Sequence, residues 1–433
     1  MSETSCARAP GRLGDLMKGI VAGDISPSEL VDMYLARIDE VQPLAEPWRV
    51  VDAEGARRVA EQRTAEARSG ALRGPLHGIP VAVKDIIDVA GFPTRCNARM
   101  LEDAPPATAD AEVVAALRCA GAIIMGKAHT TEFAFTYPSP ARNPHNLAHT
   151  PGGSSSGSAA AVASGCVPLA LGTQTMASVN RPAAYCGIGA FKPSSRLLST
   201  YGVSLLAPMY DTVGFYGQTT ADAIAMFEAL APPHVVPAAA PLGGVLVLDD
   251  PLIFDMVPAM AAALERMVEA CREAGIAVER ARSPVPFEEI RQLHWRTMHY
   301  EVGRLHTRRL GAGDGISDRF RAVIEEGLGI DDETYLTDRT TLQAVRARIG
   351  ETMKGRAVLW PAAPGPAPEG LDWTGDPRYI APWTALGGPM VTIPAGVDGS
   401  GLPLAGILIG RPGDDANMCA LARTVAAAAE VLP

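Results

Sequence analysis

The chain has 433 residues, of which 47% are hydrophobic and 20% are charged, and its formal net charge is −10 at pH 7. This length and composition allow a large buried core, such as one α/β enzyme core with an inserted lobe. The acidic balance, without any Lys/Arg-rich run, argues against nucleic acid and anionic membranes as partners. No uninterrupted apolar stretch of about 18 residues or secretory signal is seen, so we expect a soluble cytoplasmic protein.

Cysteine and lysine usage narrows the chemistry further. The seven cysteines are scattered and lack a C-x-x-C spacing, which argues against a disulfide framework or a zinc site. Only five lysines are present, and three of them lie between residues 84 and 192: Lys84, Lys127 and Lys192. A chain that otherwise uses arginine for positive charge needs a reason for each of these three lysines.

The first half of the chain alternates predicted helices and strands. A helix is expected over 26–42, because a capping-type serine precedes apolar residues at helical spacing. A strand is expected within 77–88, and a helix followed by a buried strand within 110–129. The small-residue segment 158–165 predicts a closely packed helix, and 167–175 predicts a buried strand.

The second half continues this alternation after a Pro-rich connection at 229–244. Residues 244–281 predict a strand–helix–strand unit, and the Arg/Glu-rich segment 286–356 predicts a long helical region. A strand running into a Pro-rich loop follows at 357–370, and a strand hairpin is expected at 388–410. Alternating strands and helices predict an α/β layered fold with a mostly buried sheet.

The segment HTPGGSSSGSAAAVASG, residues 149–165, contains a serine cluster directly before the small-residue helix. Gly153–Gly157 fits G-x-S-x-G, which would make Ser155 the nucleophile of an α/β-hydrolase elbow. That motif requires a preceding strand, whereas ARNPHNLAHTPG contains two prolines and predicts a loop. The downstream histidines are in a charged helical stretch: His294, His299 and His306. A helix-capping or anion-binding loop is the alternative.

A longer block explains more of the pattern. Residues 151–194, PGGSSSGSAAAVASGCVPLALGTQTMASVNRPAAYCGIGAFKPS, closely resemble the amidase signature family. The resemblance also covers PLHGIPVAVKDIID, ARNPHN, DTVGFYG and GDPRYIAPWTALGGPMVTIPAG, and so extends over about 12–425. Gln174 and the string SVNRPAAYCG are most similar to the malonamidase branch.

The family fold implied by this resemblance is a single α/β/α domain around a large mixed β-sheet. We expect that domain to span residues 1–433. Its signature core would occupy about 70–218 and 357–425, with a variable helical lobe at about 219–356 that helps to shape the pocket.

The resemblance also implies a Ser–Ser–Lys triad. Ser178 would be the nucleophile, Ser154 the bridging serine on a cis peptide bond, and Lys84 the base. This set is physically coherent, because a serine hydroxyl needs an adjacent base and burial lowers the pKa of a lysine. The chemistry implied by this triad requires no metal and no cofactor. Asp85 would point to the other side of its strand, so it need not pair with Lys84. Lys127 and Lys192 are interpreted as structural.

Backbone N–H groups of the turn before the nucleophile would hold the oxyanion: Thr175, Met176, Ala177 and Ser178. The family usually has Gly-Gly where this chain has Met176-Ala177. A turn that needed positive φ would strain the methionine. A turn with an ordinary backbone would keep its donors and add apolar bulk to the acyl pocket.

Gln174, Asn180 and Arg181 are the expected substrate-binding residues. Arg181 matches an arginine associated with a substrate carboxylate, and a structural ion pair is its alternative role. The apolar bulk of Met176 favours aryl or apolar amides, anilides and carbamates (urethanes), with esterase side activity. Three alternatives stay open: a malonamate-type amide hydrolase, an amidotransferase subunit, and a catalytically degenerate ligand-binding homologue. The expected partner is a small molecule, and the oligomeric state is left open, with a homodimer as one form.

Overall fold

One mixed sheet of eleven strands organises the computed structural model, which describes residues 5–7, 11–236 and 241–429. The strand order across the sheet is β1-β3-β2-β4-β6-β5-β10-β11-β9-β7-β8. The strands are β1 Trp48–Val51, β2 Pro80–Lys84, β3 Ile123–Ala128, β4 Leu169–Gln174, β5 Gly189–Lys192, β6 Thr212–Gly217, β7 Val245–Asp249, β8 Val278–Arg282, β9 Ala357–Pro361, β10 Met390–Val397 and β11 Pro403–Ile409.

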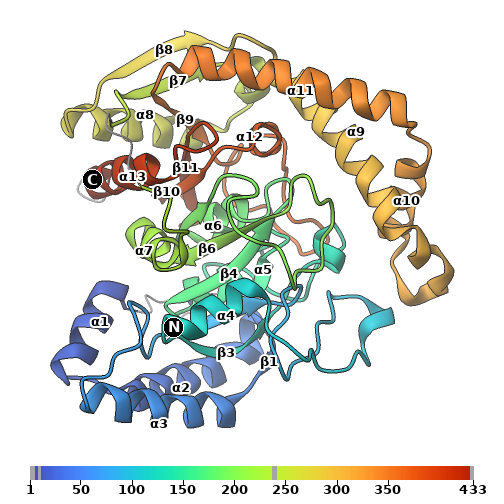
Figure 1. Cartoon of the computed structure of the whole chain (residues 1–433). Coiled ribbons are helices and arrows are strands. Elements are labelled where there is room, and N and C mark those ends of the chain that lie inside the picture. Colours follow the sequence, from blue (N-terminus) through green and yellow to red (C-terminus); the bar gives the residue numbers. More distant parts are fainter. Residues whose placement is uncertain (1–4, 8–10, 237–240, 430–433) are drawn as a thin grey trace.

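Helices surround this sheet (Figure 1). The α-helices are α1 Leu13–Ala22, α2 Pro27–Ala45, α3 Ala53–Arg68, α4 Glu112–Cys119, α5 Ser156–Ala163, α6 Asn180–Cys186, α7 Thr220–Leu230, α8 Pro258–Glu273, α9 Phe287–His306, α10 Asp318–Leu328, α11 Asp332–Met353, α12 Ala381–Leu386 and α13 Asp415–Ala429. The 3₁₀ helices are η1 Arg99–Leu101, η2 Glu132–Ala134, η3 Pro251–Ile253 and η4 Thr307–Gly315. The predicted mixed α/β class is confirmed.

Local signals account for the boundaries of these elements. Helix α2 begins after Ser26, whose side chain accepts a hydrogen bond from Glu29 N, while the Glu29 carboxylate accepts one from Ser26 N. This reciprocal capping box satisfies two N–H groups that the first helical turn leaves without partners. The helix ends with Glu46 in the left-handed conformation (φ 46°).

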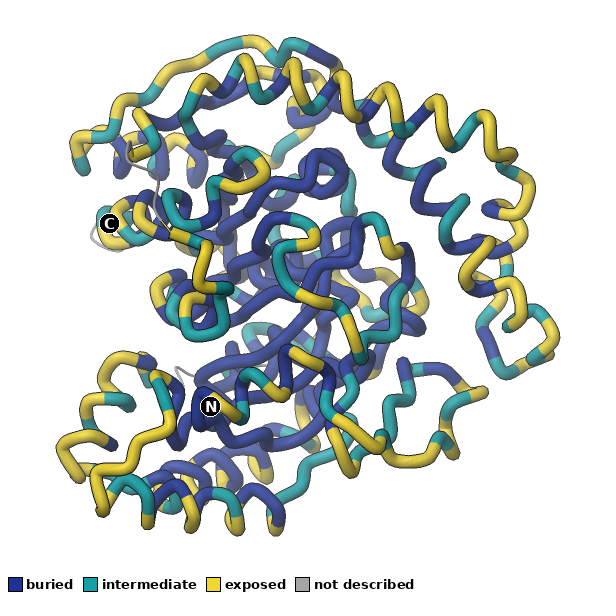
Figure 2. Tube along the Cα trace, in the orientation of Figure 1, coloured by how far each residue is buried: buried dark blue, intermediate teal, exposed yellow. Residues whose placement is uncertain are grey.

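Most strands in the middle of the sheet are buried along their whole length. β2, β3, β4, β5, β6, β9 and β11 are each fully buried, which requires cover on both faces, whereas β10 is exposed at its C-terminal end. α7, α8 and α13 form one row of helices against the central strands, and α5 and α6 pack against one another and the same part of the sheet. Figure 2 shows the buried residues concentrated in these strands and the exposed residues on the outer helices.

Residues 219–356 are only partly helical. β7 and β8 extend the same sheet, so this segment shares the core rather than forming a lobe apart from it. The helices α9, α10 and α11 form the outer arm seen in Figure 1, and α9 also contacts α12 of the core. Part of the Pro-rich connection, residues 237–240, lies outside the described residues.

No helix in the described part of the chain combines the length and the apolar character needed to cross a membrane.

Candidate active site

Lys84 is the last residue of β2 and is completely buried. Its Nζ donates hydrogen bonds to Ser154 Oγ (2.7 Å) and Thr173 Oγ1 (2.8 Å). β2 and β4 are parallel neighbours, with Val83 opposite Leu171, so the ends of both strands meet at one edge of the sheet. This register places Lys84, at the end of β2, beside Thr173 of β4 and close to the loop that carries Ser154.

Burial changes the charge balance of this site. Loss of water around the ammonium lowers the pKa of Lys84 to about 7, although the nearby Asp211 opposes this effect. Burial also raises the pKa of Asp211 to about 7. A substantial fraction of Lys84 is therefore neutral near pH 7 and able to accept a proton, as a general base must be.

Ser154 lies in the loop between β3 and α5, and the peptide bond that precedes it, Gly153–Ser154, is cis. The family resemblance implied this conformation. Arg181 donates to Gly153 O, the carbonyl of this peptide, at 2.8 Å, and Thr131 N donates to Ser154 O, the carbonyl of the next peptide, at 3.1 Å. The serine hydroxyl is thus held against Lys84 by its own backbone.

Ser178 follows β4 in the turn before α6 and is 6% exposed. Its carbonyl accepts hydrogen bonds from Ser155 N (3.4 Å) and from the hydroxyl of Tyr216 (3.1 Å). The backbone of Ser178 therefore lies directly beside the Ser154–Ser155 segment. The structure thus gathers the lysine and the two serines selected from the sequence at one edge of the sheet.

The turn between Gln174 and Ser178 is held by side chains on both sides. Gln174 Oε1 accepts hydrogen bonds from Val179 N (2.8 Å) and Asn180 N (3.0 Å). Gln174 Nε2 donates to Thr384 Oγ1 (3.0 Å). Thr384 in turn donates to the carbonyl of Met176. Gln174, one of the expected substrate-binding residues, thus shapes the turn.

Neither Met176 nor Ala177 is among the residues with positive φ, so the turn does not require glycine at these positions. Met176 is 8% exposed. Within the described part of the chain, the backbone N–H groups of Thr175, Met176, Ala177 and Ser178 have no protein acceptor. All four expected N–H groups are therefore free of protein partners, as donors to an oxyanion would need to be.

Sequence reasoning did not assign the residues behind this turn. The hydroxyl of Thr175 donates to Asp211, whose other oxygen accepts from Leu206 N (2.7 Å). His294 Nε2 lies 3.0 Å from the carbonyl of Thr175. Asp211 was detectable as the first residue of DTVGFYG, whereas the sequence offered His294 only as a downstream partner for Ser155.

Asn180 and Arg181 are turned toward the protein. Asn180 Nδ2 donates to Thr392 Oγ1 at 3.0 Å. The Arg181 guanidinium donates to Gly375 O (2.6 Å) as well as to Gly153 O, and also to Thr374 Oγ1 (3.0 Å). Arg181 therefore ties the cis-peptide loop to the segment before α12, through carbonyl and hydroxyl oxygens rather than a carboxylate. Two of its nitrogens are committed to these contacts.

The other serines of the cluster join α5 to β4. Ser155 Oγ donates to Thr173 O and accepts from Thr173 N, both at 3.2 Å, and Ser158 Oγ donates to Leu171 O at 2.8 Å. Ser155 occupies the N-cap position of α5, but its side chain makes no capping hydrogen bond. The helix capping considered as an alternative for this segment is therefore not made by Ser155. Ser155 is completely buried, which disfavours the elbow hypothesis.

The two remaining buried lysines have local partners. Lys127 Nζ forms a 2.9 Å salt bridge with Asp85, and both side chains are almost fully buried. Asp85 thus pairs away from Lys84, as strand alternation predicts. Lys192 Nζ donates to Pro193 O at 2.7 Å. Both lysines have the structural contacts expected from the sequence.

The mixed sheet and the buried Lys–Ser pair beside a second serine define an α/β protein with a Ser–Ser–Lys arrangement. A family model described as Amidase matches residues 29–236. The chain is 32% identical to a glutamyl-tRNA(Gln) amidotransferase subunit of Anaeromyxobacter sp. (strain K) over 469 aligned residues, which cover 94% of each chain. This chain belongs to the amidase family.

Two further comparisons agree with the family. The chain is 43% identical over 219 residues to the corresponding glutamyl-tRNA(Gln) amidotransferase subunit of Roseiflexus castenholzii (strain DSM 13941 / HLO8). That match covers 49% of this chain and 44% of the relative, so it spans less than half of the relative's length. A crystal structure of an amidase superimposes with a TM-score of 0.87 at 28% identity, covering 96% of this chain and 99% of that chain.

Proposed function

We propose that this chain hydrolyses carboxamide C–N bonds, with Ser178 as nucleophile, Ser154 as proton relay and Lys84 as base. The observation that supports this proposal most directly is the 2.7 Å hydrogen bond from Lys84 Nζ to Ser154 Oγ, made by a completely buried lysine. A surface lysine has a pKa near 10.4 and would stay protonated. Burial supplies the neutral amine that a weak serine nucleophile needs.

The proposed reaction has two halves. Neutral Lys84 takes the proton of Ser154 while Ser154 takes that of Ser178, and Ser178 Oγ attacks the carbonyl carbon. Backbone N–H groups at 175–178 hold the oxyanion, and as the C–N bond breaks the relay returns the proton to the leaving amine. Water, deprotonated by the same relay, then attacks the acyl-enzyme and releases the acid and Ser178.

The proposed substrates are apolar or aryl amides, anilides and carbamates, with esters as side substrates. Met176 supports this choice, because an apolar side chain replaces glycine in the turn next to the nucleophile. Arg181 supports it as well, since both of its terminal guanidinium nitrogens are engaged by Gly153, Thr374 and Gly375. A malonamate-type substrate would need a cationic group for its carboxylate, and Arg181 is the only residue that the sequence offered for this role.

A second candidate function is that of an amidotransferase subunit. The observation that favours it is the alignment with the Anaeromyxobacter relative over 94% of both chains. The acidic net charge and the apolar turn favour the first proposal. Glutamine hydrolysis that appears only when the chain is purified with partner subunits would support the amidotransferase and contradict an independent amidase.

The decisive experiment is labelling with a fluorophosphonate, followed by peptide mass mapping and turnover assays with an anilide, a carbamate and malonamate. We expect the adduct on Ser178, its loss in Lys84→Ala, and its retention in Lys18→Ala, which removes an exposed lysine of α1. An adduct on Ser155 would contradict the triad. Complete lack of labelling and turnover would favour the degenerate ligand-binding alternative. Faster turnover of malonamate than of the anilide would contradict the substrate proposal.

A further inference from the structure

A second site lies where the outer helix α11 meets the core. A cavity of about 150 Å³ lies between α11, α12 and the chain between β5 and β6. Its lining residues include Ser195, Arg196, Arg339, Arg346 and Thr384. None of the three proposed triad residues is among them.

Three polar groups that line this cavity lack hydrogen-bond partners. They are Ser195 Oγ, Arg339 Nε and Arg346 Nε; each of these atoms is buried, although its residue is only partly buried, and none has a hydrogen-bond partner among the described residues. A buried N–H or hydroxyl without a partner costs about 1–3 kcal/mol. Three such groups around one cavity indicate that a ligand with several acceptor oxygens satisfies them.

The charge of the cavity has the same sign throughout. Arg196, Arg339 and Arg346 line it, and no aspartate or glutamate of the described chain does. Burial, together with repulsion from Arg196, lowers the pKa of Arg346. An anion in the cavity would offset both effects.

Two acidic side chains of the helices α9 and α11, Glu301 and Asp338, have other partners. Glu301 accepts hydrogen bonds from Met209 N (2.8 Å) and from the hydroxyl of Tyr335 (2.7 Å). Asp338 binds both Nε and Nη2 of Arg296 at 2.7 Å. Of the guanidinium groups in the cavity, Arg346 makes one hydrogen bond, from Nη2 to the Ala385 carbonyl at 3.1 Å.

We propose that this cavity binds a small oxyanion of the phosphate class, held by Arg346, Arg339 and the hydroxyl of Ser195. Guanidinium groups match the geometry of such oxygens and form charge-assisted hydrogen bonds with them. A volume of 150 Å³ corresponds to roughly five water molecules, which is sufficient for one phosphate. Thr384 lines the same cavity and holds the Met176 carbonyl, so the site adjoins the nucleophile turn.

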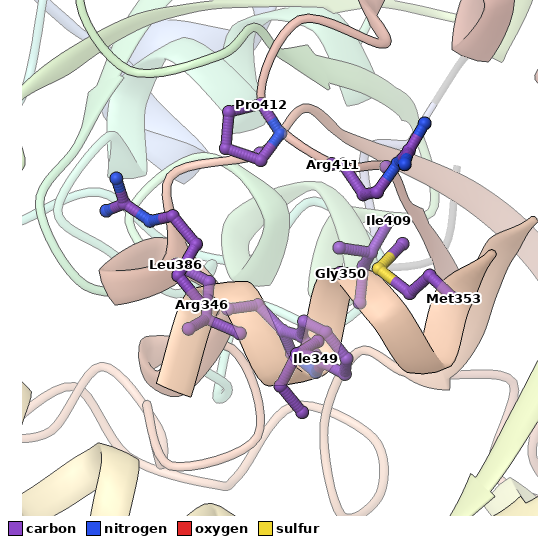
Figure 3. Close-up of a pocket in the computed structure, with 11 residues that line it drawn as sticks. Arg346, Ile349, Gly350, Met353, Leu386, Ile409, Arg411 and Pro412 are labelled. Atoms are coloured by element: carbon purple, nitrogen blue, oxygen red, sulfur yellow. The ribbon is translucent and has the colours of Figure 1, made fainter. Parts of the chain in front are cut away.

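The neighbouring cavity has a different lining. It has a volume of about 360 Å³, shares Arg346 and Pro412 with the first, and has an apolar floor that includes Ile349 and Met353 (Figure 3). Its other arginine, Arg411, is already paired with Asp414 at 3.2 Å. The unpartnered donors thus place the oxyanion in the smaller cavity.

The test is direct binding of inorganic phosphate to the full-length protein, by isothermal titration calorimetry and by the shift of Tm, at constant ionic strength with chloride as reference. We expect one phosphate per chain, and a rise of Tm that follows the mass-action law for a ligand of the native state. Arg346→Gln and Ser195→Ala should each weaken binding by about tenfold or more. Arg348→Gln, an exposed arginine two positions further along α11, should bind phosphate like the wild type.

The outcomes separate cleanly. Wild-type protein that shows no phosphate-specific heat or Tm shift contradicts the proposal, as does binding that Arg346→Gln and Ser195→Ala leave unchanged. If Arg346→Gln does not fold, the wild-type titration and Ser195→Ala still decide the question. The measurement requires no catalytic turnover, so it stands whether or not the proposed amidase activity is found.

Discussion

His294 Nε2 lies 3.0 Å from the carbonyl oxygen of Thr175, although 119 residues separate the two in the chain. A carbonyl oxygen can only accept, so Nε2 of His294 carries the proton. Burial lowers the pKa of His294 to about 3, which keeps the ring neutral at every pH at which the protein is assayed. Helix α9 of the outer arm thereby holds the turn that precedes Ser178.

This contact makes His294 a positioning residue. We predict that His294→Leu lowers kcat by about tenfold and the free energy of unfolding by about 1–3 kcal/mol, because the Thr175 carbonyl loses its buried donor. His294→Gln should restore part of kcat, since its amide can donate to the same oxygen. His234→Gln, at an exposed position, is the matched control. A merely structural histidine would lower stability but leave kcat of the folded protein unchanged.

The environment of Lys84 predicts the pH dependence of the proposed hydrolysis. Only neutral Lys84 can accept a proton, and its pKa is lowered to about 7. We therefore expect kcat/KM to rise with pH through an apparent pKa near 7 and then to level off. Asp211 titrates in the same range, so the observed value belongs to the pair. A profile that is flat between pH 6 and 9, measured with a neutral anilide, would contradict the lysine base.

Lys84 and Lys127 offer a matched pair of lysine variants. Lys84→Ala should lower kcat/KM by about 10²–10⁴-fold, the usual contribution of general base catalysis. Lys127→Ala should instead lower the free energy of unfolding by about 3–5 kcal/mol, because it leaves Asp85 buried without its partner. Folded Lys127→Ala protein should keep the wild-type pH profile, and steady-state kinetics with chemical denaturation measure both effects.

Met176 is predicted to set the acyl preference. Met176 does not have positive φ, so the turn does not depend on this side chain or on glycine, and Met176→Gly should fold and keep its oxyanion donors. We expect the ratio of kcat/KM for an anilide to that for malonamate to fall by about 10–100-fold, the range for losing apolar contact in a pocket. Met176→Leu, which conserves volume, should leave the ratio close to that of the wild type. An unchanged ratio in Met176→Gly would show that the side chain does not contact the acyl group.

Arg181 allows positioning to be separated from carboxylate binding. If the main role of Arg181 is to hold the Gly153 and Gly375 carbonyls, Arg181→Lys should lower kcat for neutral and anionic amides alike. A lysine cannot make both hydrogen bonds in the geometry of the guanidinium, so the loop that bears Ser154 would be less well fixed. Parallel assays with an anilide and with malonamate measure this. A rise of KM confined to the anionic amide would instead assign Arg181 to the substrate carboxylate.

Much of the fold was predictable because its signals are local. The capping serine at Ser26, the apolar segments that became β2 and β4, and the small-residue run of α5 each specify an element within a few residues. The residues proposed for catalysis could also be identified from the sequence, since Lys84, Ser154 and Ser178 lie in long contiguous segments that resemble the family. The pattern of residues 244–281 predicted a strand, a helix and a strand, and the structure confirms all three elements. Only the strand order shows that the two strands belong to the core sheet.

The supports of the site could be decided only by tertiary structure. Thr384 reaches the Met176 carbonyl across 208 residues, and Arg181 reaches Gly375 across 194. No periodicity or local propensity encodes such pairs, because each depends on which faces meet when helices pack on the finished sheet. The sequence by itself thus determined the element types and the candidate chemical groups. Packing determined that Lys84 is buried beside Ser154, that the Met176 turn needs no glycine, and that Arg181 and His294 hold the backbone around Ser154 and Ser178.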